Sequence, residues 1–143
     1  MTEHTMNLAR TIDAPVERVY DAWLSPSWGE WAGPAGSHGK VTLMEPQVGG
    51  RYRMVMHAPN GMTLAIGGVY RVLERPAKIV MSWKWEHEDE ETLVTLTFAP
   101  LAGGKTALTV LHEGFGSQER HDDHARGWAG TVDRLAAKLA GAA

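Results

Sequence analysis

Apolar side chains recur in steps of three and four near the end of the chain, between Ser117 and Leu139. They are Ala125, Trp128, Val132, Leu135 and Leu139. This spacing places them on one stripe of an α-helix. Ser117 suits the N-cap position, Lys138 suits the last turn, and Gly141 is a stop signal just beyond it. Because burying a large apolar side chain contributes roughly 1.5–3 kcal/mol, we expect this helix to pack on a sheet and to organise the fold.

Most of the chain upstream alternates between apolar and polar residues, which predicts strands with one buried face. The predicted strands cover residues 4–13, 41–45, 51–57, 64–72, 79–85, 92–99 and 105–113. The inward rows of the longer strands are Tyr52, Met54 and Met56; Leu64, Ile66, Gly68, Tyr70 and Val72; Ile79, Met81, Trp83 and Trp85; and Val94, Leu96 and Phe98. Asn60–Gly61 predicts a hairpin turn, because both residues tolerate positive φ. The strands after the first one, joined by short turns, predict an antiparallel meander.

Two short helices are predicted between the first strand and the second. Asp13 is a candidate N-cap for the first helix, and Pro15 fits its first turn. One face of this helix carries Val16, Val19, Tyr20, Trp23 and Leu24. A second helical turn is expected over residues 26–31, followed by a loop to residue 36 at the mouth of a cavity. The acidic run 87–91 is expected to be a solvated loop.

Composition narrows the class of protein. The chain has 143 residues and no cysteine, which predicts a single domain over residues 1–143 without disulfides. Its net charge is -3 and its basic residues are scattered, which argues against nucleic acid as a partner. No secretory signal or membrane-spanning stretch is visible, so we expect a cytoplasmic protein with no membrane partner. Seven methionine and six tryptophan residues indicate a roomy, adaptable interior.

Motifs for nucleotide binding and for nucleophilic catalysis are missing. The glycines at 33 and 39 precede Lys40, but they are one residue too far apart for a phosphate-binding loop. Val41 stands where such a loop has Ser or Thr. A catalytic thiol and a Gly-x-Ser-x-Gly elbow are both absent from the sequence. We therefore expect no cofactor and assign no catalytic residue.

Histidine and glutamate near the start of the last helix leave acid–base chemistry open. His121 and His124 lie about one helical turn apart, and His112 and Glu113 end the preceding strand. These groups have the donor types of a zinc site, but no metalloprotease spacing accompanies them, so solvated histidines and no metal are the preferred interpretation. His121, Glu113 or Tyr70 could still polarise a carbonyl in a cavity. For Glu113, a structural hydrogen bond is the favoured alternative.

Several short motifs occur in an order that resembles one family over nearly the whole chain. They are Ala14–Pro15, Trp31–Ala32–Gly33–Pro34, Gly49–Gly50, Asn60–Gly61, His112–Glu113–Gly114–Phe115 and Gly127–Trp128. The sequence resembles the family related to the activator of Hsp90 ATPase, within the START/Bet v 1-like (SRPBCC) helix-grip superfamily. This resemblance implies an α+β fold in which a curved antiparallel sheet wraps around a long C-terminal helix, with two short helices after the first strand. It also implies an apolar cavity between sheet and helix.

The residues expected to line this cavity are inward-facing, with aromatic side chains prominent. They are Trp31, Met54, Met56, Tyr70, Trp83, Trp85, His121 and Trp128. Core packing is the favoured role for Trp128, and for Trp85 the two roles are equally supported. The leading hypothesis is a non-enzymatic protein that encloses a small hydrophobic ligand, aromatic or lipid-like. The family resemblance adds a co-chaperone module acting on an Hsp90-type chaperone, and the third hypothesis is a cyclase- or hydratase-like cavity enzyme.

Overall fold

The computed structural model describes residues 4–34 and 36–140. Its elements, in chain order, are β1 (His4–Ile12), α1 (Val16–Ala22), α2 (Trp28–Trp31), β2 (His38–Met44), β3 (Arg51–His57), β4 (Thr63–Glu74), β5 (Lys78–Trp85), β6 (Glu91–Leu101), β7 (Lys105–Phe115) and α3 (Gln118–Ala140). Within the described residues the strands form one sheet in the order β1-β7-β6-β5-β4-β3-β2, and every pair is antiparallel. The predicted meander is therefore confirmed, with β1 added at the β7 edge.

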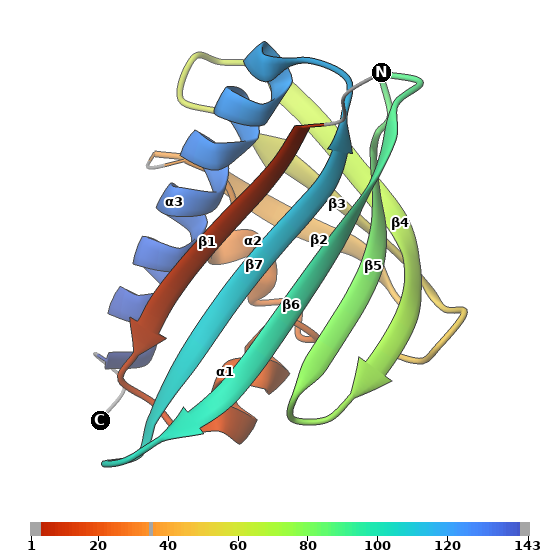
Figure 1. Cartoon of the computed structure of the whole chain (residues 1–143). Coiled ribbons are helices and arrows are strands. Elements are labelled where there is room, and N and C mark those ends of the chain that lie inside the picture. The colour runs from red at the N-terminus through yellow and green to blue at the C-terminus, as the bar shows by residue number, and fades with distance from the viewer. Residues whose placement is uncertain (1–3, 35, 141–143) are drawn as a thin grey trace.

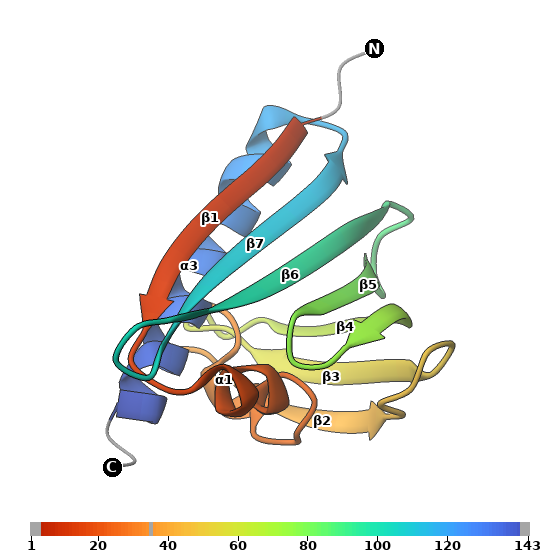
Figure 2. The same cartoon turned by 60° about the horizontal axis from the view of Figure 1, so that its bottom comes forward.

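The sheet is curved, and α3 runs along one of its faces (Figure 1). The turned view shows α1 beside the end of β6 (Figure 2), where the Tyr20 ring packs edge-on against Phe98. The predicted helix-grip fold is confirmed. None of the helices in the described part of the chain is long and apolar enough to cross a membrane.

The core lies between the concave face of the sheet and α3. Every second side chain of the central strands is buried there, as the period-two pattern predicts. On the helix side the buried side chains are Trp128, Thr131, Val132, Leu135 and Leu139. Ser117 caps α3, because its Oγ accepts the backbone N–H of Arg120 at 3.2 Å. Gly141, the expected stop signal, lies outside the described residues.

The inward row of β4 differs from the prediction at Val72. The pairing with β5 shifts between Tyr70 and Val72, so one extra residue enters β4 at this point. Such a bulge reverses the alternation of side chains beyond it. Leu73 consequently packs against the core in the place expected for Val72.

Two local predictions are wrong in detail. Pro15, not Asp13, precedes the first residue of α1, and no side-chain hydrogen bond caps that helix. In the β3–β4 turn, Gly61 has a φ of +88° whereas Asn60 does not adopt positive φ. The Gly61 N–H donates to the Ala58 carbonyl at 3.0 Å, so the turn is a three-residue loop that needs a left-handed conformation only at glycine.

Gly68 leaves room on the face of the sheet for the buried side chain of Tyr52. The Tyr52 hydroxyl donates to the Ser82 carbonyl at 2.6 Å, across the intervening strand β4. A Cβ atom on residue 68 would lie 2.0 Å from that carbonyl oxygen and 2.8 Å from the Tyr52 ring. Only glycine therefore fits where β3, β4 and β5 pack below the cavity.

Candidate ligand-binding cavity

A cavity of about 370 Å³ lies between the sheet and α3. Its apolar wall consists of Trp28, Ala32, Gly33, Pro34, Met54, Met56, Ala58, Leu64, Trp83, Trp85, Gly127 and Trp128. Its polar lining consists of His87, Glu88, Arg120, Asp123, His124, Arg126 and Thr131. This volume falls within the range of small-molecule sites, which combine apolar walls with a few polar groups.

Four indole rings pack together in the wall, with Trp83 at their centre. The Trp83 ring centroid lies 5.2 Å from Trp128, 5.9 Å from Trp85 and 6.3 Å from Trp28. The contacts with Trp85 and Trp28 are edge-to-face, with interplanar angles of 85° and 66°. Because such aromatic pairs add about 0.5–1.5 kcal/mol beyond their buried area, Trp83 fixes the positions of its neighbours.

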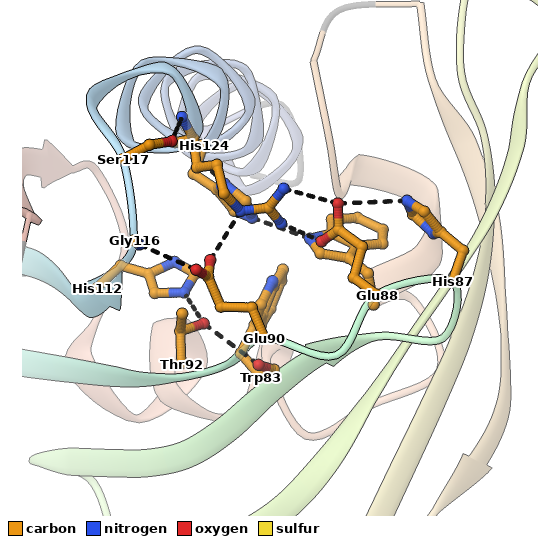
Figure 3. A network of polar contacts seen from close by, with 11 residues as sticks. Trp83, His87, Glu88, Glu90, Thr92, His112, Gly116, Ser117 and His124 are labelled. Carbon is orange, nitrogen blue, oxygen red and sulfur yellow. Dashed lines mark hydrogen bonds and ion pairs between the residues drawn. The ribbon is translucent and has the colours of Figure 1, made fainter.

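His112 holds Trp128 in place from beneath the wall. The Trp128 Nε1–H donates to His112 Nδ1 at 2.8 Å, so the ring proton must be on Nε2. His112 Nε2 then donates to Thr92 Oγ1 at 2.6 Å, and the Thr92 hydroxyl donates to the Trp83 carbonyl at 3.2 Å (Figure 3). Burial, reinforced by the nearby His124, lowers the pKa of His112 to about 2. His112 is a neutral positioning group for the cavity wall.

His124 holds the Trp85 ring in place by a hydrogen bond of the same kind. The Trp85 Nε1–H donates to His124 Nε2 at 2.9 Å, and His124 Nδ1 donates to the Arg120 carbonyl at 2.8 Å. Burial lowers the pKa of His124 as well. His124 precedes Trp128 by four residues and therefore lies on the apolar stripe of α3. That spacing is the signal that identifies it as a wall residue.

The acidic run 87–91 is not simply solvated, because part of it is bound to α3. The Arg120 guanidinium contacts both carboxylate oxygens of Glu88, through Nη1 at 2.7 Å and through Nη2. Its Nε donates to Glu90 at 2.7 Å, and the second oxygen of Glu90 accepts the Gly116 N–H at 2.9 Å (Figure 3). Hydrogen bonding to Arg120 lowers the pKa of Glu88. We call Glu88, Glu90 and Arg120 the rim clasp, since it joins the β5–β6 loop to α3 at the edge of the cavity.

The structure brings some of the expected ligand-binding residues together and not others. Met54, Met56, Trp83, Trp85 and Trp128 all line the cavity, whereas Trp31, Tyr70 and His121 do not. The Trp31 ring packs edge-to-face on Trp23, with the ring centroids 4.8 Å apart. The Tyr70 ring packs on Tyr52, with the centroids 5.4 Å apart. His121 hydrogen-bonds Asp122 at 2.9 Å, near the beginning of α3. The lining residues absent from the predicted set include Trp28, the Ala32–Pro34 loop, Leu64, Arg120 and His124.

Glu113 lies apart from the cavity. It alternates with the inward-facing His112 on β7 and lines a separate shallow hollow with Arg71 and Glu91. None of His121, Glu113 and Tyr70, the groups considered for polarising a carbonyl, lines the cavity.

A zinc titration tests the prediction that His121 and His124 hold no metal. Within residues 4–34 and 36–140, no group of three or more His, Cys, Asp or Glu side chains is placed to bind an ion. Both ring nitrogens of His124 are already hydrogen-bonded, and zinc would have to break one of these contacts. Calorimetric titration into chelator-treated protein should show no tight stoichiometric binding. A sub-micromolar one-to-one isotherm that disappears in His121→Ala would contradict this prediction.

A curved antiparallel sheet that encloses a cavity against a long C-terminal helix defines a helix-grip protein. The model of the family described as Activator of Hsp90 ATPase homolog 1-like protein matches residues 13–140, and the chain belongs to this family. A Chromobacterium violaceum protein of known structure is 32% identical, with 94% of this chain and 96% of that chain covered and a TM-score of 0.87. A Rhodobacter sphaeroides protein is 28% identical over 96% and 92% of the two chains, with a TM-score of 0.78. A Silicibacter pomeroyi protein that carries the family's name is 25% identical over 96% and 98%, with a TM-score of 0.81. No curated protein matches this sequence.

Proposed function

We propose that this protein binds a small, flat hydrophobic molecule in the cavity between the sheet and α3. The observation that carries the proposal is the indole wall, in which Trp128 is held by the buried, neutral His112 and Trp85 by the half-buried His124, whose pKa is also lowered. Fixed aromatic faces bind flat apolar molecules at a low cost in conformational entropy. A single apolar pocket supplies limited specificity, so we expect micromolar affinity for generic ligands of this shape.

Binding is favoured over catalysis because the ionisable groups near the wall have structural partners. Both ring nitrogens of His112 and of His124 are hydrogen-bonded, and each side chain positions an indole. A general acid or base must exchange its proton with the substrate. Neither histidine can do so without releasing the tryptophan or the oxygen that it holds.

The co-chaperone hypothesis depends on the family's description alone. A large exposed apolar patch would favour such an interaction module. Among the described residues, the exposed large hydrophobic side chains are Val48, Met62 and Leu101, in the β2–β3 loop, the β3–β4 loop and the end of β6. Val48 and Met62 lie in the loops at opposite ends of β3, so these side chains are dispersed.

Tryptophan fluorescence tests the proposal directly. We expect flat aromatic compounds to quench the emission saturably, and we expect Trp83→Leu and Trp85→Leu each to weaken binding about tenfold or more, because each removes a stacking face. Trp31→Leu is the matched control, since Trp31 is buried outside the cavity, and it should retain the parent affinity. Circular dichroism verifies that each variant is folded.

Two results would reject the binding proposal. One is an absence of saturable quenching across the compound set. The other is equal loss of affinity in Trp31→Leu and Trp83→Leu, which would show that the effect does not arise in the cavity. If no compound binds and the protein stimulates a chaperone ATPase, the co-chaperone hypothesis replaces the present one.

A further inference from the structure

The charged side chains that line the cavity are already neutralised by one another. Arg120 is bound by Glu88 and Glu90 in the rim clasp, and Arg126 pairs with Asp123. An anionic ligand would have to take Arg120 from two carboxylates and leave them partly buried without their cation. Removing one partner of a desolvated ion pair is strongly unfavourable. The rim therefore opposes binding of a carboxylate.

His112 and His124, the histidines that hold the indole wall, offer a ligand no free ring nitrogen. His124 Nε2 accepts from Trp85, and His124 Nδ1 donates to the Arg120 carbonyl. His112 is engaged on both sides by Trp128 and Thr92. A ligand that depends on donating a hydrogen bond or a proton to either of these two imidazoles is consequently disfavoured.

Two indole N–H groups of the cavity wall have no acceptor in the described part of the chain. They belong to Trp28 and Trp83, which are 2% and 7% exposed. The other two wall indoles, Trp85 and Trp128, do have acceptors. Buried donors are usually hydrogen-bonded in folded proteins. The buried N–H groups of Trp23 and Trp31 are also unpaired in the described residues, but only Trp28 and Trp83 line the cavity, where an acceptor on a bound molecule can reach them.

We infer that the ligand is uncharged and carries a hydrogen-bond acceptor, as in an aromatic ketone, that reaches the N–H of Trp83 or Trp28. This inference rests on the proposed function and specifies its ligand class. The flat skeleton packs on the indole faces, and the carbonyl oxygen accepts from the unpaired donor. The same donors discriminate against a hydrocarbon of equal shape, which leaves them unpaired.

Three probes of one skeleton separate these contributions: 2-ethylnaphthalene, 2-acetylnaphthalene and 2-naphthoate. By calorimetry on the unmodified protein, 2-acetylnaphthalene should bind about tenfold more tightly than 2-ethylnaphthalene. The carboxylate should bind more weakly than either neutral probe, because the rim clasp opposes it. Equal affinities for the ketone and the hydrocarbon, or tightest binding of 2-naphthoate, would overturn the inference while leaving the proposed function standing. Failure of all three probes to bind would reject both.

Conservative variants identify the donor. Trp83→Phe and Trp28→Phe retain an aromatic face and remove the N–H, so one or both should abolish the ketone preference, measured as the ratio of 2-acetylnaphthalene to 2-ethylnaphthalene affinity in the same variant. Trp23→Phe is the matched control, because its Nε1 is also buried and unpaired within the described residues but the side chain does not line the cavity. It should keep the full preference. A preference that survives in both test variants would show that the acceptor lies elsewhere and would overturn the assignment.

Discussion

Replacing Trp128 by alanine is expected to lower the free energy of unfolding by about 3–5 kcal/mol, the usual cost of truncating a core aromatic residue. Trp128 is 4% exposed, and the centroid of its ring lies 5.9 Å from that of Trp23 and 5.2 Å from that of Trp83. The substitution also leaves His112 Nδ1 without the N–H that it accepts. A buried polar group that loses its partner costs about 1–3 kcal/mol. The cavity left by the indole and the unpaired His112 imidazole therefore both lower the free energy of unfolding.

Urea denaturation measures this loss, and two further variants separate its causes. Trp128→Phe keeps most of the apolar volume but removes the N–H, so its loss should be smaller than that of the alanine variant. Glu119→Ala, at an exposed position in the first turn of the same helix, should stay within about 0.5 kcal/mol of the parent. If Trp128→Ala unfolded at the same urea concentration as the parent, α3 would not be the element on which the fold depends.

Most of the fold can be predicted from the sequence because its pattern is regular. The alternation in β3, β5 and β6 and the stripe of α3 follow directly from one buried face on each element. The bulge at Val72 could not be predicted, since the apolar pair Val72–Leu73 fits either alternation. The rim clasp could not be predicted either. Arg120 and Glu88 are distant in the sequence, and only the curvature of the sheet brings the β5–β6 loop to α3.

The residues that line the cavity could be predicted only where they lie on the inward face of a strand or a helix. Met54, Met56, Trp83 and Trp85 reach the cavity because they share the inward faces of neighbouring strands. In α2, a single helical turn gives no stripe to choose between Trp28 and Trp31, and it is Trp28 that lines the cavity. Tyr70 lies beyond Gly68, where the side chain of Tyr52 crosses to Ser82 and fills the space.

The two histidines that hold the indole wall, His112 and His124, predict acid sensitivity of the fold. His112 has a pKa of about 2 in the folded protein, against an ordinary value of 6.5 in the unfolded chain. Between these values the unfolded chain carries one more proton, so the free energy of unfolding falls as the pH falls below 6.5. The lowered pKa values of His124 and Glu88 act in the same direction. The stability contributed by neutral His112 is thus fully present above pH 6.5 and is lost progressively in acid.

From His112 alone the expected slope approaches about 1.4 kcal/mol per pH unit well below pH 6.5, and the loss between pH 6.5 and 4.5 is roughly 2 kcal/mol. Urea unfolding at several pH values measures it, and His112→Asn isolates it by removing the titrating group. Whatever its stability at pH 7, that variant should show a slope shallower than the parent's by about 1.4 kcal/mol per pH unit. Thr109→Asn, at a half-buried position on the same strand that does not face the core, keeps His112 and should keep the full slope. Equal slopes in the parent and in His112→Asn would mean that His112 takes up its proton without unfolding the protein. The Trp128–His112–Thr92 chain of hydrogen bonds could then not be what holds the cavity wall.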